Sequence, residues 1–156
     1  AAYASGPGEG HSLELADGSS VRLDAGTRLH VRIDPLSRQV TLYQGEAEFD
    51  VAHENLRPFT VAARDLVVHD LGTRFTVRHR ADKVRVVLLE GAADVRDGEN
   101  GRVLTVLKPG QQVESAARGA TLRLTSANLG RVLAWLSKAA TSLRGMRALM
   151  RLSCRR

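Results

Sequence analysis

The sequence predicts an all-β domain, an antiparallel β-sandwich or barrel-like wrap of about ten short strands, followed by a C-terminal amphipathic helix. Between residues 12 and 113, apolar residues recur at every second position in short runs, which is the spacing of strands with one buried face. Turn residues such as Asp17-Gly18 and Lys108-Pro109-Gly110 separate these runs at close intervals, as in sandwiches and barrels. Beyond Leu124 the apolar spacing changes to that of a helix.

The first half of the chain begins with a predicted hairpin. Leu13 and Leu15 precede the Asp17-Gly18 turn, and alternating apolar residues follow it over 21–23. The next strand, 29–33, ends at Asp34-Pro35 because proline cannot donate a hydrogen bond to a neighbouring strand. A longer run then covers residues 40–51, and Gly45 inside it indicates a bulge or a close approach of the backbone.

The second half contains six more predicted strands. Arg57-Pro58 forces an extended start for the first of them, because the residue before a proline disfavours the helical region. The six runs are 59–63, 66–69, 75–77, 84–88, 93–95 and 103–106. Phe49, Phe59 and Phe75 alternate with polar neighbours, so we predict that they form the aromatic part of the core. The phrases 42–47 and 88–93 place a glycine in similar surroundings, which we interpret as two halves of one domain using the same bend.

Charge divides the chain into two parts. Residues 1–114 contain 14 Lys and Arg against 17 Asp and Glu, whereas residues 115–156 contain nine basic residues and no acidic one. We therefore predict a mildly acidic β-domain over 1–114 and a basic C-terminal extension over 115–156, helical from about residue 127. The longest aliphatic run, Val86 to Leu89, is far too short to cross a bilayer.

The sequence predicts no catalytic residue, cofactor or metal site. No two of the five histidines have the close spacing of metal ligands, and we interpret them as solvated residues of strands and loops; they are His11, His30, His53, His69 and His79. Glu46 and Glu48 share one face of a strand, as in a glycosidase pair, but no aromatic sugar platform accompanies them. We interpret them as solvated charges on an exposed face.

Six short sequence motifs are spread over about 110 residues. In chain order they are 3–9, 15–29, 44–51, 57–61, 71–77 and 89–91. In that order and spacing they resemble the periplasmic domain of the FecR family. The motif residues that the resemblance marks are expected to be mainly structural, and no partner-binding residue is singled out. They are Asp17, Gly18, Ser19, Gly45, Phe49, Arg57, Pro58, Phe59, Gly72, Thr73, Phe75 and Gly91.

The resemblance implies the periplasmic sensor domain of a single-pass inner-membrane regulator, and not an enzyme. Its implied partners are the signalling domain of a TonB-dependent outer-membrane receptor and, through a cytoplasmic segment outside this chain, an extracytoplasmic-function sigma factor. No nucleic acid and no cofactor is expected. The membrane would be reached only through an upstream helix.

The C-terminal extension departs from the family pattern. FecR proteins continue after a tryptophan, here Trp135, into a Gly-x-Leu-x-Phe phrase that this chain lacks. We therefore expect the extension to be truncated or altered, as a reading-frame shift would produce. The alternative function is a structural β-sandwich whose basic tail binds an anionic membrane or nucleic acid, although the tail lacks the interleaved aromatic residues typical of single-strand binding.

Overall fold

The computed structural model describes residues 2–4, 6, 10–70, 72–116 and 122–126, and within them it confirms the all-β prediction. Thirteen strands and no helix occur in these residues. The strands are β1 (Ala2–Ala4), β2 (His11–Glu14), β3 (Ser20–Leu23), β4 (Arg28–Ile33), β5 (Arg38–Asp50), β6 (Phe59–Ala63), β7 (Leu66–Asp70), β8 (Arg74–Arg80), β9 (Lys83–Glu90), β10 (Ala93–Asp97), β11 (Val103–Leu107), β12 (Gln111–Ala116) and β13 (Arg123–Ser126). The predicted C-terminal helix lies outside the described residues, and none of them forms a helix with the length and hydropathy of a membrane span.

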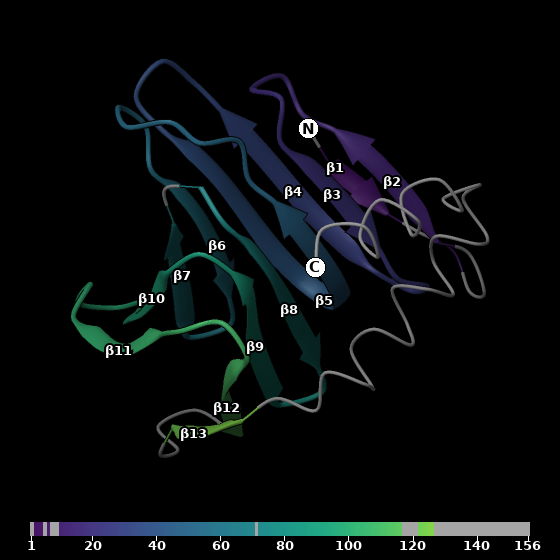
Figure 1. Cartoon of the computed structure of the whole chain (residues 1–156). Coiled ribbons are helices and arrows are strands. Elements are labelled where there is room, and N and C mark those ends of the chain that lie inside the picture. Colours follow the sequence, from purple (N-terminus) through teal and green to yellow (C-terminus); the bar gives the residue numbers. More distant parts are fainter. Residues whose placement is uncertain (1, 5, 7–9, 71, 117–121, 127–156) are drawn as a thin grey trace, which may run out of the picture.

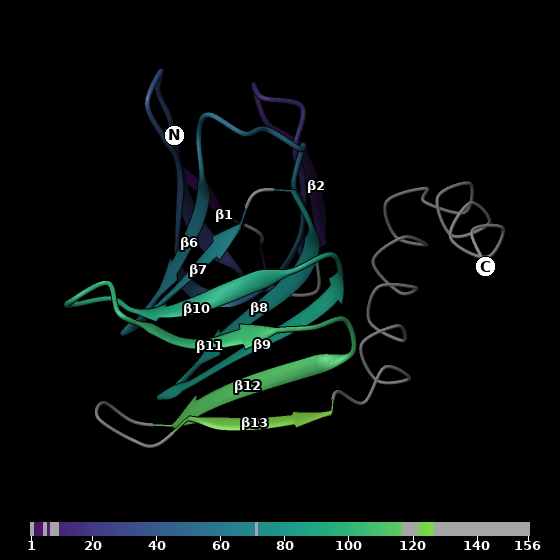
Figure 2. The same cartoon turned by 60° about the vertical axis from the view of Figure 1, so that its left-hand side comes forward.

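Two sheets share the long strand β5 and curl into a half-open, barrel-like wrap (Figures 1 and 2). Sheet A contains β1, β4, β6, β7, β10, β11 and the first half of β5. Sheet B contains β2, β3, β8, β9, β12, β13 and the second half of β5. Since one strand belongs to both sheets, their inner faces enclose a common core.

Gly45 marks the point where β5 passes from sheet A to sheet B. Its φ is +99°, and a Cβ there would collide with Thr27, so only glycine fits. Gly91, 46 residues later, has a φ of +87° where the chain leaves sheet B for sheet A, and a Cβ there would collide with Thr73. The structure thus confirms that the two halves of the domain use the same bend.

The two hairpins that lead to these glycines are also built alike. In β4–β5, Leu29 faces Leu42, and in β8–β9, Phe75 faces Leu88, so the pairings are again 46 residues apart. Each hairpin shifts register just before that pair, between Arg28 and Leu29 or between Arg74 and Phe75. A shared register and a shared bulge indicate a duplicated hairpin, because register is set by pattern and turn together.

The prediction of an antiparallel fold is wrong at one pair of strands. β5 and β6 run parallel, with Arg38 beside Phe59, whereas the other pairs among the described residues are antiparallel. A parallel pair normally requires a crossover of a dozen or more residues. Here the bend at Gly45 brings both ends of β5 together, so the short segment 51–58 is sufficient. Arg38 in fact reaches the carbonyl oxygen of Ala52 at 2.9 Å.

The predicted aromatic core is confirmed. Phe49 stacks on Phe75 with ring centroids 5.2 Å apart and meets Phe59 edge-on at 6.1 Å. All three rings are fully buried, and inward-facing Val and Leu side chains of both sheets surround them. The core therefore holds the two sheets together by apolar burial. The outer faces and edges of the sheets remain as candidate interaction surfaces.

Candidate interaction surfaces

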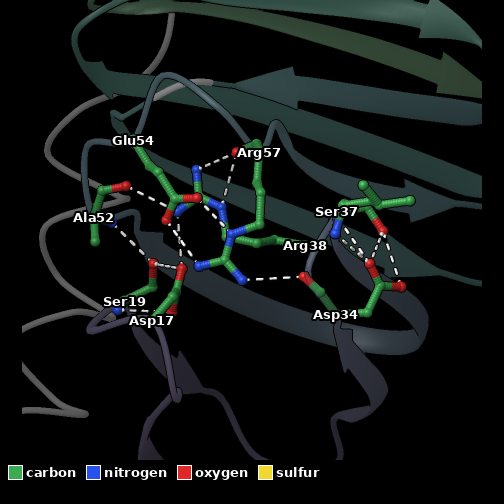
Figure 3. Close-up of polar contacts among 9 residues, drawn as sticks. Asp17, Ser19, Asp34, Ser37, Arg38, Ala52, Glu54 and Arg57 are labelled. Atoms are coloured by element: carbon green, nitrogen blue, oxygen red, sulfur yellow. Dashed lines mark hydrogen bonds and ion pairs between the residues drawn. The ribbon is translucent and has the colours of Figure 1, made fainter.

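A buried arginine gathers several motif residues at one end of the wrap. We call this group the Arg38 cluster; it comprises Asp17, Ser19, Arg38, Ala52, Glu54 and Arg57 (Figure 3). The side chains of Arg38 and Asp17 are both 0% exposed, and Arg38 Nη1 donates to Asp17 Oδ2 at 2.8 Å. Arg38 Nε and Nη2 donate to the carbonyl oxygen of Arg57 at 3.0 and 2.8 Å, and the guanidinium lies 5.4 Å from the Phe59 ring centroid.

Asp17 and Ser19 connect the β2–β3 turn to the same arginine. Asp17 Oδ1 accepts from the Ser19 N–H at 3.0 Å and Asp17 Oδ2 accepts from Ser19 Oγ at 2.7 Å, while Ser19 Oγ accepts from the Ala52 N–H at 2.9 Å. Burial favours the neutral carboxyl, but the hydrogen bonds from Arg38 and Ser19 outweigh it and lower the pKa of Asp17. Asp17 is therefore held as a carboxylate inside the protein.

Arg57 extends the cluster outward to the β4–β5 turn. It donates from Nη2 to Glu54 Oε2 at 2.9 Å and from Nη1 to the carbonyl oxygen of Asp34 at 3.0 Å. The hydrogen bond from Arg57 lowers the pKa of Glu54. Asp34 in turn accepts the N–H of Leu36 and the N–H of Ser37. Arg38 and Arg57 thus fix three loops relative to one another.

The other motif residues lie away from this cluster. Gly45 and Gly91 stand at the two sheet-changing bends, Gly72 and Thr73 lie between β7 and β8, and Phe49 and Phe75 are in the core. Gly18 belongs to the β2–β3 turn, Pro58 to the 51–58 connection and Phe59 to the base of the cluster. The sequence analysis did not single out Arg38, although a signal was present. Arg38 is a charged residue that shares the inward-facing side of its strand with Val40 and Leu42.

The outer face of sheet B carries charges of both signs. One row crosses four strand pairings through Glu46, Arg78, Arg85, Glu114 and Arg123, each the direct partner of the next. Opposite charges in such cross-strand pairs are stabilising and like charges are destabilising. The pairing of Arg78 with Arg85 is therefore an unfavourable step in the row.

The interpretation of Glu46 and Glu48 as solvated charges is wrong. They are only 6% and 4% exposed, because long arginine side chains of neighbouring strands lie against them. Arg74 Nε donates to Glu48 Oε1, Arg22 lies 3.7 Å from Glu48 Oε2, and Arg85 lies 3.9 Å from Glu46. Burial raises the pKa of Glu46, with Arg85 and Arg78 acting in the opposite direction, and Glu48 Oε2 makes no hydrogen bond within the described part of the chain.

A hollow of about 220 Å³ opens at the turn end of the β8–β9 hairpin. We call it the basic hollow. Its lining consists of Arg78, Arg80, Lys83, Val84, Arg85 and Glu114. Arg78 faces Arg85 and Arg80 faces Lys83 across the hairpin, so four cations stand in two adjacent like-charged pairs.

One edge of sheet A, the strand β11, carries apolar residues on its outer face. Among the described strands, β11 pairs with β10 alone. A bulge at Val95 and Arg96 places both Val103 and Val106 opposite outward-facing residues, and these valines are 47% and 58% exposed. An unpaired strand with exposed β-branched residues is able to accept another strand.

The histidines do not come together. His11, His30 and His53 are exposed and His69 and His79 are half-buried. His79 Nδ1 lies 3.1 Å from the carbonyl oxygen of Leu42. Within the ranges that the structure covers, no group of three His, Cys, Asp or Glu side chains has the arrangement of a metal site.

Comparisons with known proteins place these features in context. A family profile described as "FecR protein" matches residues 1–94. Two crystal structures of a candidate anti-sigma factor from Parabacteroides distasonis, at 1.65 and 2.50 Å resolution, are 26% identical to the chain and superpose with TM-scores of 0.78 and 0.77. The similarity covers 87% of this chain and 64% of each solved chain, so this chain spans less than two thirds of their length. A search of curated proteins gave no match.

Proposed function

Because this chain belongs to the FecR protein family, we propose that it is the sensor domain of a membrane-anchored regulator of an extracytoplasmic-function sigma factor. The observation that carries the proposal is the family match over residues 1–94, which spans the Arg38 cluster and both duplicated hairpins. The similarity to a candidate anti-sigma factor supports the same class of regulator. Contact with the sigma factor would belong to the cytoplasmic segment of such a regulator.

The signal would come from the periplasmic signalling domain of a TonB-dependent outer-membrane receptor. We assign its docking to the edge of β11, where a partner strand would continue sheet A by backbone hydrogen bonding. Two features of β11 support this assignment. Val103 and Val106 expose apolar surface there, and residues 103–107 contain no proline, glycine or charged residue of the kind that protects edge strands from pairing.

Titration calorimetry of this chain against the signalling domains of the TonB-dependent receptors encoded in the same genome tests the proposal. We expect one of them to bind, and Val106→Lys to weaken that binding about tenfold because a lysine on an edge opposes strand addition. Leu36→Lys is the matched control, since Leu36 is 84% exposed but lies in the β4–β5 turn. Failure of every receptor domain to bind would overturn the relay, whereas unchanged binding by Val106→Lys would overturn the β11 edge alone.

A further inference from the structure

The basic hollow breaks a rule of sheet stability, and the carboxylates beside it, Glu46 and Glu114, compensate for this only in part. Like charges directly opposite each other in a sheet are destabilising, yet Arg78 faces Arg85 and Arg80 faces Lys83. Departures of this kind from the local rules of stability are expected at functional sites. The hollow is therefore the place on sheet B where a ligand is most to be expected.

The carboxylates near the hollow neutralise its cations only in part. Arg85 lies 3.9 Å from Glu46 and Arg80 lies 3.5 Å from Asp24, both beyond good hydrogen-bond distance. Arg78 faces Glu46 in the pairing of β5 with β8 and lowers the pKa of that carboxyl through its charge, but within the described residues neither Arg78 nor Lys83 forms a side-chain hydrogen bond or a close ion pair. Four cations and one carboxylate line the hollow, so its lining carries a net positive charge while residues 1–114 as a whole are mildly acidic.

We propose that the basic hollow binds the carboxylate side chains of an acidic segment of a partner protein. Its volume of about 220 Å³ is below the roughly 300–1,000 Å³ of small-molecule pockets. One or two protruding side chains match it better. Guanidinium groups bind carboxylates through two parallel hydrogen bonds, and Arg78 has the unused donors for such a pair.

A polyanion such as nucleic acid or an anionic lipid surface is a poorer occupant. Glu114 stands in the lining of the hollow and would repel a phosphate, whereas a protein segment can offer a donor to Glu114 beside its own carboxylates. The mild negative charge of the surrounding β-domain also opposes the long-range attraction on which backbone binding of nucleic acid depends. The inference rests on the proposed function only in that the partner is a protein; it does not require docking at β11.

Fluorescence anisotropy with a labelled hexaglutamate peptide tests this site in the intact chain. We expect the peptide to bind the wild type and to bind the double variant Arg78→Gln/Lys83→Gln about tenfold more weakly, because each lost charged hydrogen bond weakens binding substantially. The matched control is Arg102→Gln/Lys108→Gln, which removes one exposed arginine and one exposed lysine from the β10–β11 and β11–β12 turns. The control should bind within about twofold of the wild type, since isolated exposed charges contribute little.

Three results would overturn the site. The first is equal weakening in the two double variants, and the second is absence of hexaglutamate binding to the wild type. The third is that inorganic phosphate or phosphatidylglycerol vesicles bind in a way that depends on Arg78 and Lys83, whereas hexaglutamate does not bind. Calorimetry with the receptor signalling domains separates this failure from that of the proposed function: receptor binding without hexaglutamate binding overturns the hollow alone, and the reverse result overturns the relay alone.

Discussion

The Arg38 cluster and the basic hollow both join arginines to carboxylates, but they differ in how far the charges are satisfied. Arg38 uses Nε, Nη1 and Nη2 to donate to Asp17 and to two backbone carbonyl oxygens. In the hollow, Arg78 and Arg85 face each other, and the nearest ion pair is 3.5 Å long. A fully satisfied buried network holds one conformation in place, whereas an excess of one charge attracts a partner. The cluster is thus expected to govern stability, and the hollow to govern binding.

The largest expected effect is that of Arg38→Met. The variant leaves the Asp17 carboxylate buried without its cation, which costs about 3–5 kcal/mol of the free energy of unfolding. Urea unfolding followed by circular dichroism measures this loss, and we expect either a much lower midpoint or no folded protein. Arg102→Met, at an exposed turn, should stay within about 0.5 kcal/mol of the wild type. An unchanged midpoint for Arg38→Met would show that the Arg38 cluster does not govern stability, and the contrast with the basic hollow would then be wrong.

A smaller loss is expected for Asp17→Asn, because the amide oxygen can still accept from Arg38. At neutral pH the weaker hydrogen bond should cost about 2 kcal/mol. The folded state lowers the pKa of Asp17 below its ordinary value of 3.8, so the unfolded chain binds this proton more readily. The stabilisation is therefore fully present above pH 3.8 and is lost as the pH falls through the folded pKa. Urea midpoints at several pH values should show the gap between wild type and variant closing below that point.

These two regions also show which parts of the structure the sequence could predict. Alternating apolar residues were sufficient for ten of the thirteen described strands, whereas β1, β12 and β13 were not predicted. Gly45 was sufficient to predict a bend, because it is a local signal like the alternation. The Arg38 cluster depends on the crossover 51–58, which brings the carbonyl oxygens of Ala52 and Arg57 back to the start of β5. The alternation of apolar and polar residues alone did not indicate that the 51–58 segment comes back to the start of β5.

Glu46 and Glu48 were misread for a related reason. Their own strand shows that they point away from the core, but their burial is due to arginines of the neighbouring strands β3, β8 and β9. Which strands become neighbours is set by the sheet order and register, and these are long-range properties. The basic hollow was missed for the same reason, since Arg78 and Arg85 become neighbours only when β8 pairs with β9.

Glu46→Gln is expected to act in the opposite direction to Asp17→Asn. Burial raises the pKa of Glu46 above its ordinary value of 4.5, so the folded state carries a penalty for the charged form at neutral pH. The neutral amide should therefore leave the free energy of unfolding unchanged or raise it by less than about 1 kcal/mol. As the pH falls through the raised pKa the wild-type penalty disappears, and the two proteins should converge below pH 4.5. A loss of stability at neutral pH would mean that Glu46 is as tightly paired as Asp17.

The smallest effect on stability is expected for Arg78→Gln, in the lining of the basic hollow. Removing this cation relieves the repulsion with Arg85 and also removes the attraction to Glu46, two opposing effects that are each on the order of 0.2–1 kcal/mol for one cross-strand pair. Urea unfolding should therefore give a free energy within about 0.5 kcal/mol of that of the wild type. Anisotropy on the same sample should show weaker binding of hexaglutamate. A loss of more than about 2 kcal/mol on unfolding would instead make Arg78 a structural residue like Arg38, because a cation that serves only to bind a partner is not needed for the fold.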